Sequence, residues 1–419
     1  MSSSNPSSLV PAARVVSFEE ARHLVEQQAV GVCPGEVETL DLLAGLGRVL
    51  AEGIMADRDF PPFARATRDG YAVRAADLAQ VPARLEVLGE VKAGDWPEPG
   101  RCSVGRGQAV GIMTGAPLPV GADAVVMVEY TAAAGTVVEI QRSVKPGENF
   151  VPRGAEARAG DLMLDRGRRL DHAAIAMAAS AGNSRVQVFR KPRVAVLSTG
   201  DEVVEIDATP GPAQIRNSNS YSLAAQVQNA GGEAVRLAIA PDERGRLRKL
   251  IEEGLSCDLL LLTGGVSMGK YDLVVQVLGE LKAEFYFTGA AIQPGRPVVF
   301  GSCSAQHKKY FFGLPGNPVS TMVTFELFAR PMIEGLTGMT PQRLIFLRAR
   351  LKSEIRTKTG LKRFLPAVLS GEFENAEVEL ARWQGSGDMA ALARANCYVV
   401  ISPERERIEA GEWVPVLMR

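Results

Sequence analysis

The spacing of apolar residues indicates a helical region that is interrupted by a β-rich insertion. Residues 16–56 show a helical pattern, in which Ser17 is placed as the N-cap before acidic residues of the first turn. Residues 154–190 return to an alanine-rich helical pattern. Between these stretches, frequent proline and glycine turns separate short β-type runs such as 124–128 and 136–140. We therefore predict a discontinuous helical domain I (14–58 and 151–190) with an inserted β-rich domain II (59–150).

From residue 191 onward, strand-type and helix-type segments alternate. The segment 258–263 is apolar without alternation, which is typical of a parallel strand buried on both faces. Asp242 is the expected N-cap of a helix that carries Leu247 and Ile251 at helical spacing. This pattern predicts a central doubly wound α/β domain III at 191–338. Its strands are expected at 193–198, 234–240, 258–263, 297–301 and 310–313, with helices at 219–229, from 242, at 271–282 and from 318.

The C-terminal segment changes to β-type patterns with few helix signals between them. These runs lie at 343–352, 378–381, 397–401 and 413–417. They predict a small β-barrel or sandwich, and we take the barrel as the prediction for domain IV at 339–419. The fold class is therefore multidomain α/β.

The composition narrows the possible functions. The chain has 419 residues, 46% of them apolar and 23% charged, which excludes global disorder. Its 47 basic and 48 acidic residues give a net charge of −1, so we expect no general nucleic-acid surface. No apolar run reaches the roughly 18 to 20 residues of a membrane span. The serine-rich N-terminus lacks the features of a secretory signal, and we expect neither secretion nor membrane insertion.

Cysteine and histidine usage favours oxygen ligands for any metal. The five cysteines are scattered, with no CxxC pair, which is typical of reduced thiols in a cytoplasmic protein and not of a zinc–thiolate site. The three histidines show no HxxxH or HExxH spacing. A metal ion in this protein should therefore be a hard cation, with Mg²⁺ preferred to Zn²⁺.

Three turns rich in glycine or proline follow predicted strands of the α/β domain. They lie at 198–202, 263–269 and 313–318, and the last places Asn317 and Pro318 at the start of a helix. Ligands of open α/β sheets bind beyond the carboxyl ends of the strands, where backbone N–H groups can approach an anion. A single turn of this kind often has no binding role, but three of them at one edge of a sheet favour an anion-binding cleft. The chain has neither GxGxxG nor a P-loop motif.

Acidic residues fall at the same predicted edge. Asp201, Glu202, Asp242 and Asp272 all stand at or just after strand ends. For Glu202 and Asp272 we favour cation binding or acid–base catalysis. The alternative for these acidic residues is helix capping and exposure to solvent, and it applies above all to Asp242. Arg296 adds a positive charge, and its alternative role is a surface ion pair.

Two further motifs complete a family resemblance. Arg68-Asp69-Gly70-Tyr71-Ala72-Val73 and the segment 112–117 precede the three turns in a fixed order. In this combination the chain resembles the molybdopterin molybdenumtransferases, the family of bacterial MoeA and the gephyrin E-domain. The resemblance implies a molybdopterin-binding type of α/β domain and an elongated homodimer. It also implies a last step of molybdenum cofactor synthesis, in which molybdate enters the dithiolene of adenylylated molybdopterin with Mg²⁺-dependent release of AMP.

The resemblance also implies the roles of individual residues. Glu202 and Asp272 are the expected metal ligands, and Asp69 and Thr114 would reach the site from the inserted domain, in their own subunit or across the dimer. Arg296, Ser320 and Ser386 match a molybdate pocket. The expected catalytic residues are Asp69, Thr114, Glu202, Asp242 and Asp272. The expected substrate-binding residues are Ser198, Thr199, Gly200, Asp201, Gly264, Gly265, Ser267, Gly269, Arg296, Pro315, Gly316, Asn317, Pro318, Ser320 and Ser386. Proteins of molybdopterin synthesis and adenylylation are the expected partners.

The chain departs from the family pattern at several positions. Gln293 and Arg296 stand where lysines are common, and Arg is not an equivalent donor to Lys. Leu361 replaces a usual Arg, and we expect Lys362 or Arg363 to compensate. Ala66 replaces a common Ser, and Glu156 stands near a common acidic pair. These changes leave tungstate as an alternative to molybdate.

Two other functions stay open from the sequence. A molybdopterin adenylyltransferase would share the α/β domain type, although such an enzyme does not need the three additional domains. A non-catalytic scaffold or nucleotide-binding module would keep the fold, but it would not need Asp69, Thr114, Glu202 and Asp272 together.

Overall fold

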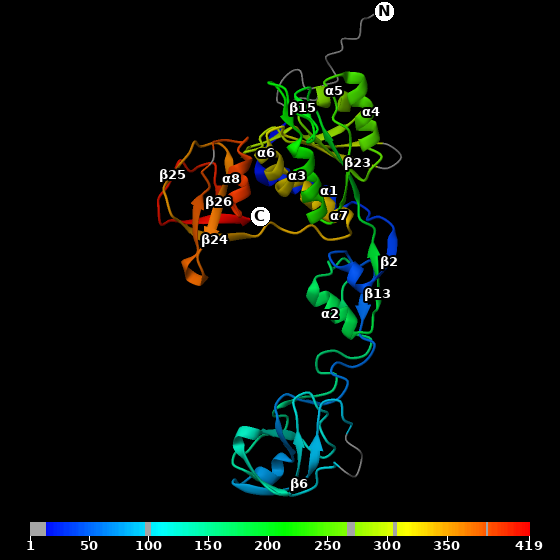
Figure 1. Cartoon of the computed structure of the whole chain (residues 1–419), viewed down its shortest axis with the longest axis vertical. Helices are drawn as coiled ribbons and strands as arrows, with labels where there is room; N and C mark the ends of the chain where they lie inside the picture. The colour runs from blue at the N-terminus through cyan, green and yellow to red at the C-terminus, as the bar shows by residue number, and fades with distance from the viewer. Residues whose placement is uncertain (1–13, 97–101, 266–272, 305–307, 383) are drawn as a thin grey trace, which may run out of the picture.

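The molecule is elongated, with a β-rich module at one end and the α/β sheet and barrel at the other (Figure 1). The computed structural model describes residues 14–96, 102–265, 273–304, 308–382 and 384–419. A smaller part that contains α2 (His172–Ser180) and β13 (Arg185–Phe189) lies between the two ends (Figure 1). Within the described residues, no helix has the length and apolar character needed to cross a membrane.

A mixed six-stranded sheet forms the centre of the α/β domain. Its strand order is β17-β14-β18-β23-β22-β19, in which the first four strands are parallel and β22 runs antiparallel to both of its neighbours. The strands span Glu233–Arg236 (β17), Arg193–Ser198 (β14), Leu259–Thr263 (β18), Lys308–Leu314 (β23), Val299–Ser304 (β22) and Glu284–Phe287 (β19). The carboxyl ends of β14, β18 and β23 therefore meet at one edge of the sheet.

Helices cover both faces of this sheet, as the apolar pattern predicts. Leu259 and Leu261 of β18 pack into one buried core, and the alternate residues Leu260 and Leu262 pack into another. The prediction that this strand is buried on both faces is thus confirmed. The first core includes side chains of α1 (Phe18–Val30), α3 (Ser218–Asn229), α6 (Pro318–Thr324) and α7 (Arg330–Leu336), and the second includes α4 (Arg244–Gly254) and α5 (Leu273–Glu280).

The predicted helices at 16–56 and 154–190 are wrong beyond α1 and α2, so the discontinuous domain is only partly helical. Ser17 caps α1 as predicted, with its Oγ accepting from Glu20 N at 3.1 Å. Pro34 and Gly35 follow soon after the helix, and proline cannot continue one. The chain then forms β2 (Val37–Asp41), which pairs antiparallel with β13, and β3 (Ile54–Met55), which pairs with β12 (Leu162–Leu164). Moreover, α1 packs against α7 of the α/β domain.

The β-rich module is a six-stranded sheet, which agrees with the short β-type runs in its sequence. The order is β8-β5-β7-β6-β10-β9, and a buried apolar core lies on each face. Its strands span Ala124–Met127 (β8), Gly70–Val73 (β5), Gln108–Ile112 (β7), Ala83–Val91 (β6), Val137–Ile140 (β10) and Thr131–Ala134 (β9).

The C-terminal strands close into a five-stranded barrel, which confirms the predicted architecture. Strand β26 pairs with both β27 and β28, and the ring continues through β24 and β30. The sequence prediction missed β26, a nine-residue strand that contains Pro366. The barrel strands span Lys362–Ser370 (β26), Glu377–Leu380 (β27), Phe346–Leu351 (β24), Trp413–Met418 (β30) and Cys397–Ile401 (β28), and α8 spans Met389–Arg394.

Short elements connect these parts. Strand β21 (Ile292–Gln293) leaves the α/β domain and pairs with β26, so a backbone seam joins that domain to the barrel. A π-helical turn at Phe325–Ala329 links α6 to α7. The remaining two-residue strands are β1 (Val15–Val16), β4 (Arg65–Ala66), β11 (Phe150–Val151), β15 (Val203–Val204), β16 (Ile215–Arg216), β20 (Gly289–Ala290), β25 (Ile355–Arg356) and β29 (Arg407–Ile408).

Candidate functional site

The three predicted turns line one pocket at the carboxyl edge of the α/β sheet. Its walls include Ser198 and Thr199 after β14, Thr263 and Gly264 at the end of β18, and Gly316 and Pro318 after β23, and its volume is about 50 Å³. Thr199 N donates to Thr263 O at 2.9 Å, which joins the first two turns directly. We call this pocket the cradle.

Glycine at position 264 is required by the close approach of these two turns. Gly264 has φ +90°, and a Cβ built on it would lie 2.5 Å from Thr199 O. At Gly265, a Cβ would lie 2.9 Å from Thr199 Oγ1. Any larger residue at either position would push the turns apart.

Two asparagines that the sequence reasoning missed hold the cradle together. Asn219 Nδ2 donates to Thr263 Oγ1 at 2.9 Å and to Gly316 O at 2.8 Å, so one amide links α3, β18 and the third turn. Asn217 Oδ1 accepts from Ser198 Oγ at 2.9 Å and from Ser220 N at 3.2 Å, and it thereby caps α3. The polar run Asn217-Ser218-Asn219-Ser220 at the start of a predicted helix was the available signal.

The cradle contains buried polar atoms that need a partner. Thr199 Oγ1 and Asn219 Oδ1 are buried, and neither has a hydrogen-bond partner among the described residues. Both residues line the pocket. Since a buried polar atom without a partner costs about 1–3 kcal/mol, these atoms favour a polar ligand at this place.

Carboxylates gather beside the cradle. Asp242 N donates to Asp201 Oδ1 at 3.1 Å, and Glu202 lines the pocket. Burial, together with the negative charges of Asp201 and Glu202, raises the pKa of Asp242. The expected N-cap role of Asp242 is wrong, because Glu243 holds the N-cap position of α4.

Part of the predicted site lies outside the described residues. These positions are Ser267, Gly269 and Asp272. Within the described ranges, no group of three or more histidine, cysteine or acidic side chains is placed to hold a metal ion. Glu202 remains the one predicted metal ligand that the structure describes.

The predicted oxyanion residues lie at the seam between the α/β domain and the barrel. Val319 N donates to Ser386 O at 3.0 Å, and a Cβ on Gly295 would lie 3.6 Å from Ser320 O. The loop that contains Arg296, the start of α6 and the Ser386 loop therefore lie together. Ser320 is buried, whereas Arg296 is exposed. Pro318, at the first turn of α6, connects this seam to the cradle.

Asp69 and Thr114 form a pair on the β-rich module. Thr114 N and Oγ1 both donate to Asp69 Oδ1, at 2.6 and 2.7 Å. These two hydrogen bonds, the backbone one first, hold the pKa of Asp69 below its usual value. Thr114 follows β7 and the loop of Asp95 follows the parallel strand β6, so both lie at one end of the sheet.

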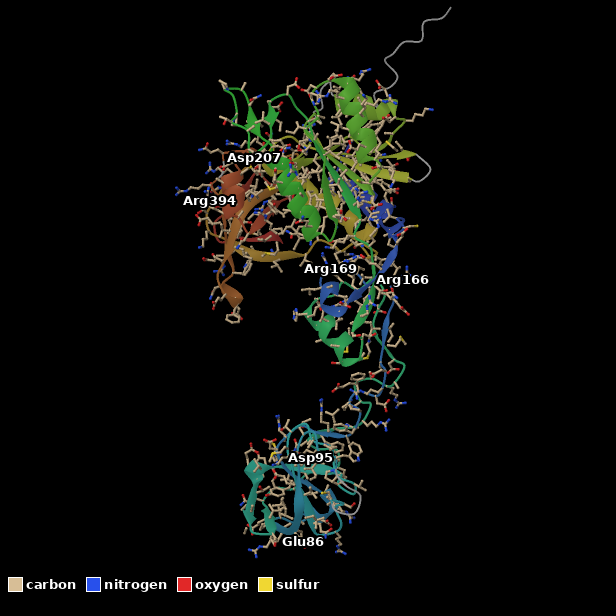
Figure 2. The ribbon with its side chains drawn as sticks, turned by 45° about the vertical axis from the view of Figure 1, so that its right-hand side comes forward. Glu86, Asp95, Arg166, Arg169, Asp207 and Arg394 are labelled. Atoms are coloured by element: carbon tan, nitrogen blue, oxygen red, sulfur yellow. The ribbon has the colours of Figure 1, made fainter. Side chains whose placement is uncertain are left out.

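Within one chain, the structure does not bring this pair to the cradle. Figure 2 shows Asp95 at the end of the module that faces the rest of the molecule, and Glu86 toward the opposite end. The module itself is set apart from the α/β sheet along the long axis (Figure 1).

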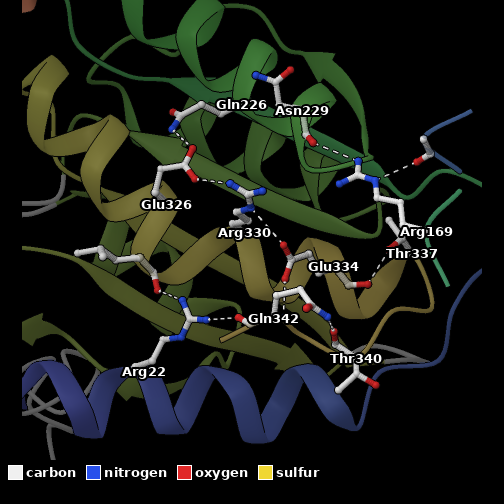
Figure 3. Close-up of polar contacts among 12 residues, drawn as sticks. Arg22, Arg169, Gln226, Asn229, Glu326, Arg330, Glu334, Thr337, Thr340 and Gln342 are labelled. Atoms are coloured by element: carbon white, nitrogen blue, oxygen red, sulfur yellow. Dashed lines mark hydrogen bonds and ion pairs between the residues drawn. The ribbon is translucent and has the colours of Figure 1, made fainter. Parts of the chain in front are cut away.

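A larger cleft lies elsewhere and has a polar network in its wall. It encloses about 740 Å³ between the part that contains Gly47 and Arg169, helix α7, and the linker at 339–345. Arg330 pairs with Glu326 at 2.9 Å and with Glu334 at 3.1 Å (Figure 3). Buried Glu334 also accepts from Gln342 N at 2.9 Å, and Arg22 donates to Gln342 O at 2.9 Å (Figure 3). This network fixes the linker that leads to the barrel.

Comparison with known proteins covers almost the whole chain. Residues 16–182 match the MoeA N-terminal region (domains I and II), residues 195–335 match the family described as probable molybdopterin binding domain, and residues 348–418 match the MoeA C-terminal region (domain IV). The chain is 34% identical to a molybdopterin molybdenumtransferase of Nostoc sp. over 391 residues, or 91% of this chain and 88% of that one.

Two further relatives agree. The molybdopterin molybdenumtransferase of Bacillus subtilis is 34% identical over 394 residues, which is 92% of this chain and 90% of that protein. A crystal structure of a molybdopterin biosynthesis MoeA protein from Pyrococcus horikoshii OT3 superposes with a TM-score of 0.78 at 29% identity, covering 97% of this chain and 100% of that one.

Proposed function

Because this chain belongs to the molybdopterin molybdenumtransferase family, a family of transferases in molybdenum cofactor biosynthesis, we propose that it inserts molybdate into adenylylated molybdopterin and releases AMP. The observation that carries this proposal is the convergence of three turns from β14, β18 and β23 on one pocket with unpartnered polar atoms. An adenylylated pterin carries several phosphate oxygens, which backbone N–H groups and hydroxyls of such turns can bind.

The carboxylates beside the cradle support the proposal of a magnesium ion there. Repulsion from Asp201 and Glu202 contributes to the raised pKa of Asp242, and a divalent cation would relieve it. We propose that Glu202 and Asp272 hold Mg²⁺, with Asp242 beside them. When bound, the ion would offset negative charge that develops on the phosphate oxygens. The chain itself would position the phosphates through Thr199, and Asp242 would hold or release a proton there.

The seam is the proposed site for molybdate. Arg296, Ser320 and Ser386 would supply positive charge and hydroxyl donors to a tetrahedral oxyanion. Pro315, Gly316, Asn317 and Pro318 lead from the cradle to Ser320, so both ligands would lie along one segment of chain.

We propose that the protein acts as a homodimer and that Asp69 and Thr114 serve the cradle of the partner. The separation of the β-rich module from the α/β sheet supports this, as does the exposed apolar surface around the large cleft. There, Leu46 is 62% exposed and Ile345 is 72% exposed, which is typical of surfaces that another protein covers.

Mixed dimers test this arrangement. Asp69→Ala chains and Glu202→Gln chains should each be inactive alone. When subunits of an equal mixture exchange without denaturation, random pairing makes about half of the dimers mixed. In each mixed dimer, one of the two sites contains both native residues. About a quarter of the parent activity should therefore return. No recovery in dimers whose mixing is verified by mass spectrometry would refute action across the dimer.

Molybdate-dependent release of AMP is the direct test of the function. The purified chain should release AMP from adenylylated molybdopterin when Mg²⁺ and molybdate are both present, and Glu202→Gln should abolish release while the dimer persists. An adenylyltransferase would instead form the adenylylated pterin from molybdopterin and Mg-ATP. Formation of that product without metal insertion would overturn the proposal. The cytoplasm and the enzymes that make and adenylylate molybdopterin are the proposed setting and partners.

A further inference from the structure

Arg216 brings a positive charge to the wall of the cradle. Among the described residues that line this pocket, it is the one basic residue, and Glu202 is the one acidic residue. The other lining residues are uncharged. Backbone N–H groups and hydroxyls can donate hydrogen bonds to a phosphate, but they carry no full charge, whereas a guanidinium is always charged. In the described part of the pocket wall, Arg216 is therefore the residue that can offset the charge of an anionic ligand.

The backbone of Arg216 is fixed to the cradle on both sides. Arg216 belongs to β16 and lies opposite Val204 in the parallel register with β15. Ile215 N donates to Glu202 O at 2.8 Å, and Asn217 N donates to Val204 O at 2.8 Å. Asn217 is also the residue that caps α3 and accepts from the first turn of the cradle. The side chain of Arg216 thus starts from a position that hydrogen bonds on either side hold in place.

The guanidinium of Arg216 keeps donors for a ligand. Its Nε donates to Ile206 O at 3.0 Å, and among the described residues it has no acidic partner. The two terminal nitrogens therefore remain for an anion. Arg236, on the neighbouring strand β17, differs in this respect. It pairs with Glu205 at 3.4 Å, and its guanidinium lies 3.8 Å from the centre of the Tyr221 ring.

A buried hydroxyl in the same pocket also requires a polar ligand. Thr199 is only 3% exposed, its Oγ1 has no partner among the described residues, and it lines the pocket together with Arg216. The volume of about 50 Å³ is far below the roughly 300–1,000 Å³ of sites that enclose a drug-sized ligand. A single phosphate group suits this space, and a fused ring system does not.

We infer that Arg216 binds the phosphate of the nucleotide part of adenylylated molybdopterin, the group that AMP retains. This inference rests on the proposed function. A guanidinium offers parallel N–H donors to two oxygens of one phosphate, and the hydroxyl of Thr199 can donate to a third. Arg216 would thereby hold the phosphate in the cradle and offset its negative charge.

Equilibrium binding of AMP and of adenosine to the full-length protein tests the inference, because the two ligands differ only in the phosphate. Arg216→Met is the variant, and Arg236→Met, which lies outside the described pocket wall, is the matched control. Loss of a charge-assisted contact should raise the Kd for AMP about tenfold to a hundredfold in Arg216→Met. The Kd for adenosine should stay at the parent value. Arg236→Met should keep both parent values.

The outcomes separate this inference from the proposed function. If Arg216→Met keeps the parent's preference for AMP over adenosine, or weakens both ligands equally, Arg216 does not bind the phosphate and the inference fails, although AMP release by the parent would still support the proposed function. If the parent releases no AMP from adenylylated molybdopterin, the proposed function fails and the inference fails with it.

A second variant covers a failure of Arg216→Met to fold. Arg216→Gln removes the charge but keeps a polar side chain at this exposed position. A weakened affinity for AMP at an unchanged melting temperature then supports the inference, and an unchanged affinity overturns it.

Discussion

Replacement of Gly264 by alanine should open the cradle by a calculable amount. The new Cβ would lie 2.5 Å from Thr199 O, which is too close for any relaxed contact, and the backbone at φ +90° disfavours a side chain. An alanine held at positive φ costs about 1–2 kcal/mol, and the steric overlap of its Cβ adds about 1–3 kcal/mol. We therefore expect a local destabilisation of about 2–5 kcal/mol.

A second glycine isolates the steric term. Gly411 has φ +86° but no heavy atom within 4 Å of its Cβ position, so Gly411→Ala carries the backbone cost alone. The difference between the two variants should be about 1–3 kcal/mol, which reports the contact between the turns of β14 and β18. AMP release should fall in Gly264→Ala and stay near the parent level in Gly411→Ala.

Hydrogen–deuterium exchange is the suitable measurement, because a multidomain chain does not unfold in one two-state step. Peptides that cover β14 and β18 should lose protection in Gly264→Ala. In Gly411→Ala, only peptides near that turn should change. Equal losses of local stability in the two variants would refute the claim that these turns are in tight contact, and with it the closed form of the cradle.

Two further predictions concern charge. The folded protein binds the proton of Asp242 more tightly than the unfolded chain, so ionisation of this residue costs stability as pH rises above its ordinary value of 3.8, and the cost is complete above the raised pKa. Asp242→Asn should therefore melt at a higher temperature than the parent near neutral pH. In a thermal-shift series, this difference in melting temperature should disappear toward about pH 4. A difference that stays constant with pH would contradict ionisation of Asp242 as its cause. Glu334→Ala should lose about 2 kcal/mol of local stability, because Arg330 and Gln342 N lose their shared carboxylate, and hydrogen–deuterium exchange of α7 and the linker at 339–345 should show the loss. Glu252→Ala, which breaks an exposed ion pair with Arg248, should change little.

The sequence predicted those features that depend on local periodicity and strand order. The unbroken apolar run of β18 indicated burial on both faces, and turn chemistry placed the Gly264 and Pro318 turns at strand ends. It did not predict β2, because this exposed strand has no clear apolar period of its own. It did not predict β26, because its buried run shows no alternation and Pro366 argues against a strand. Asn219 was missed because its hydrogen bonds join residues 44 and 97 positions away, whereas the polar run around it indicates only the start of a helix.

Helix α6 joins the cradle to the seam with no hinge between them. Pro318 lines the cradle and Ser320 lies at the seam, two residues along the same helix, which corresponds to about 3 Å of axial rise. In the proposed function, the helix would therefore fix the distance between the nucleotide site and the molybdate site. Departure of one product that shifts the first turn of α6 would then also displace Ser320.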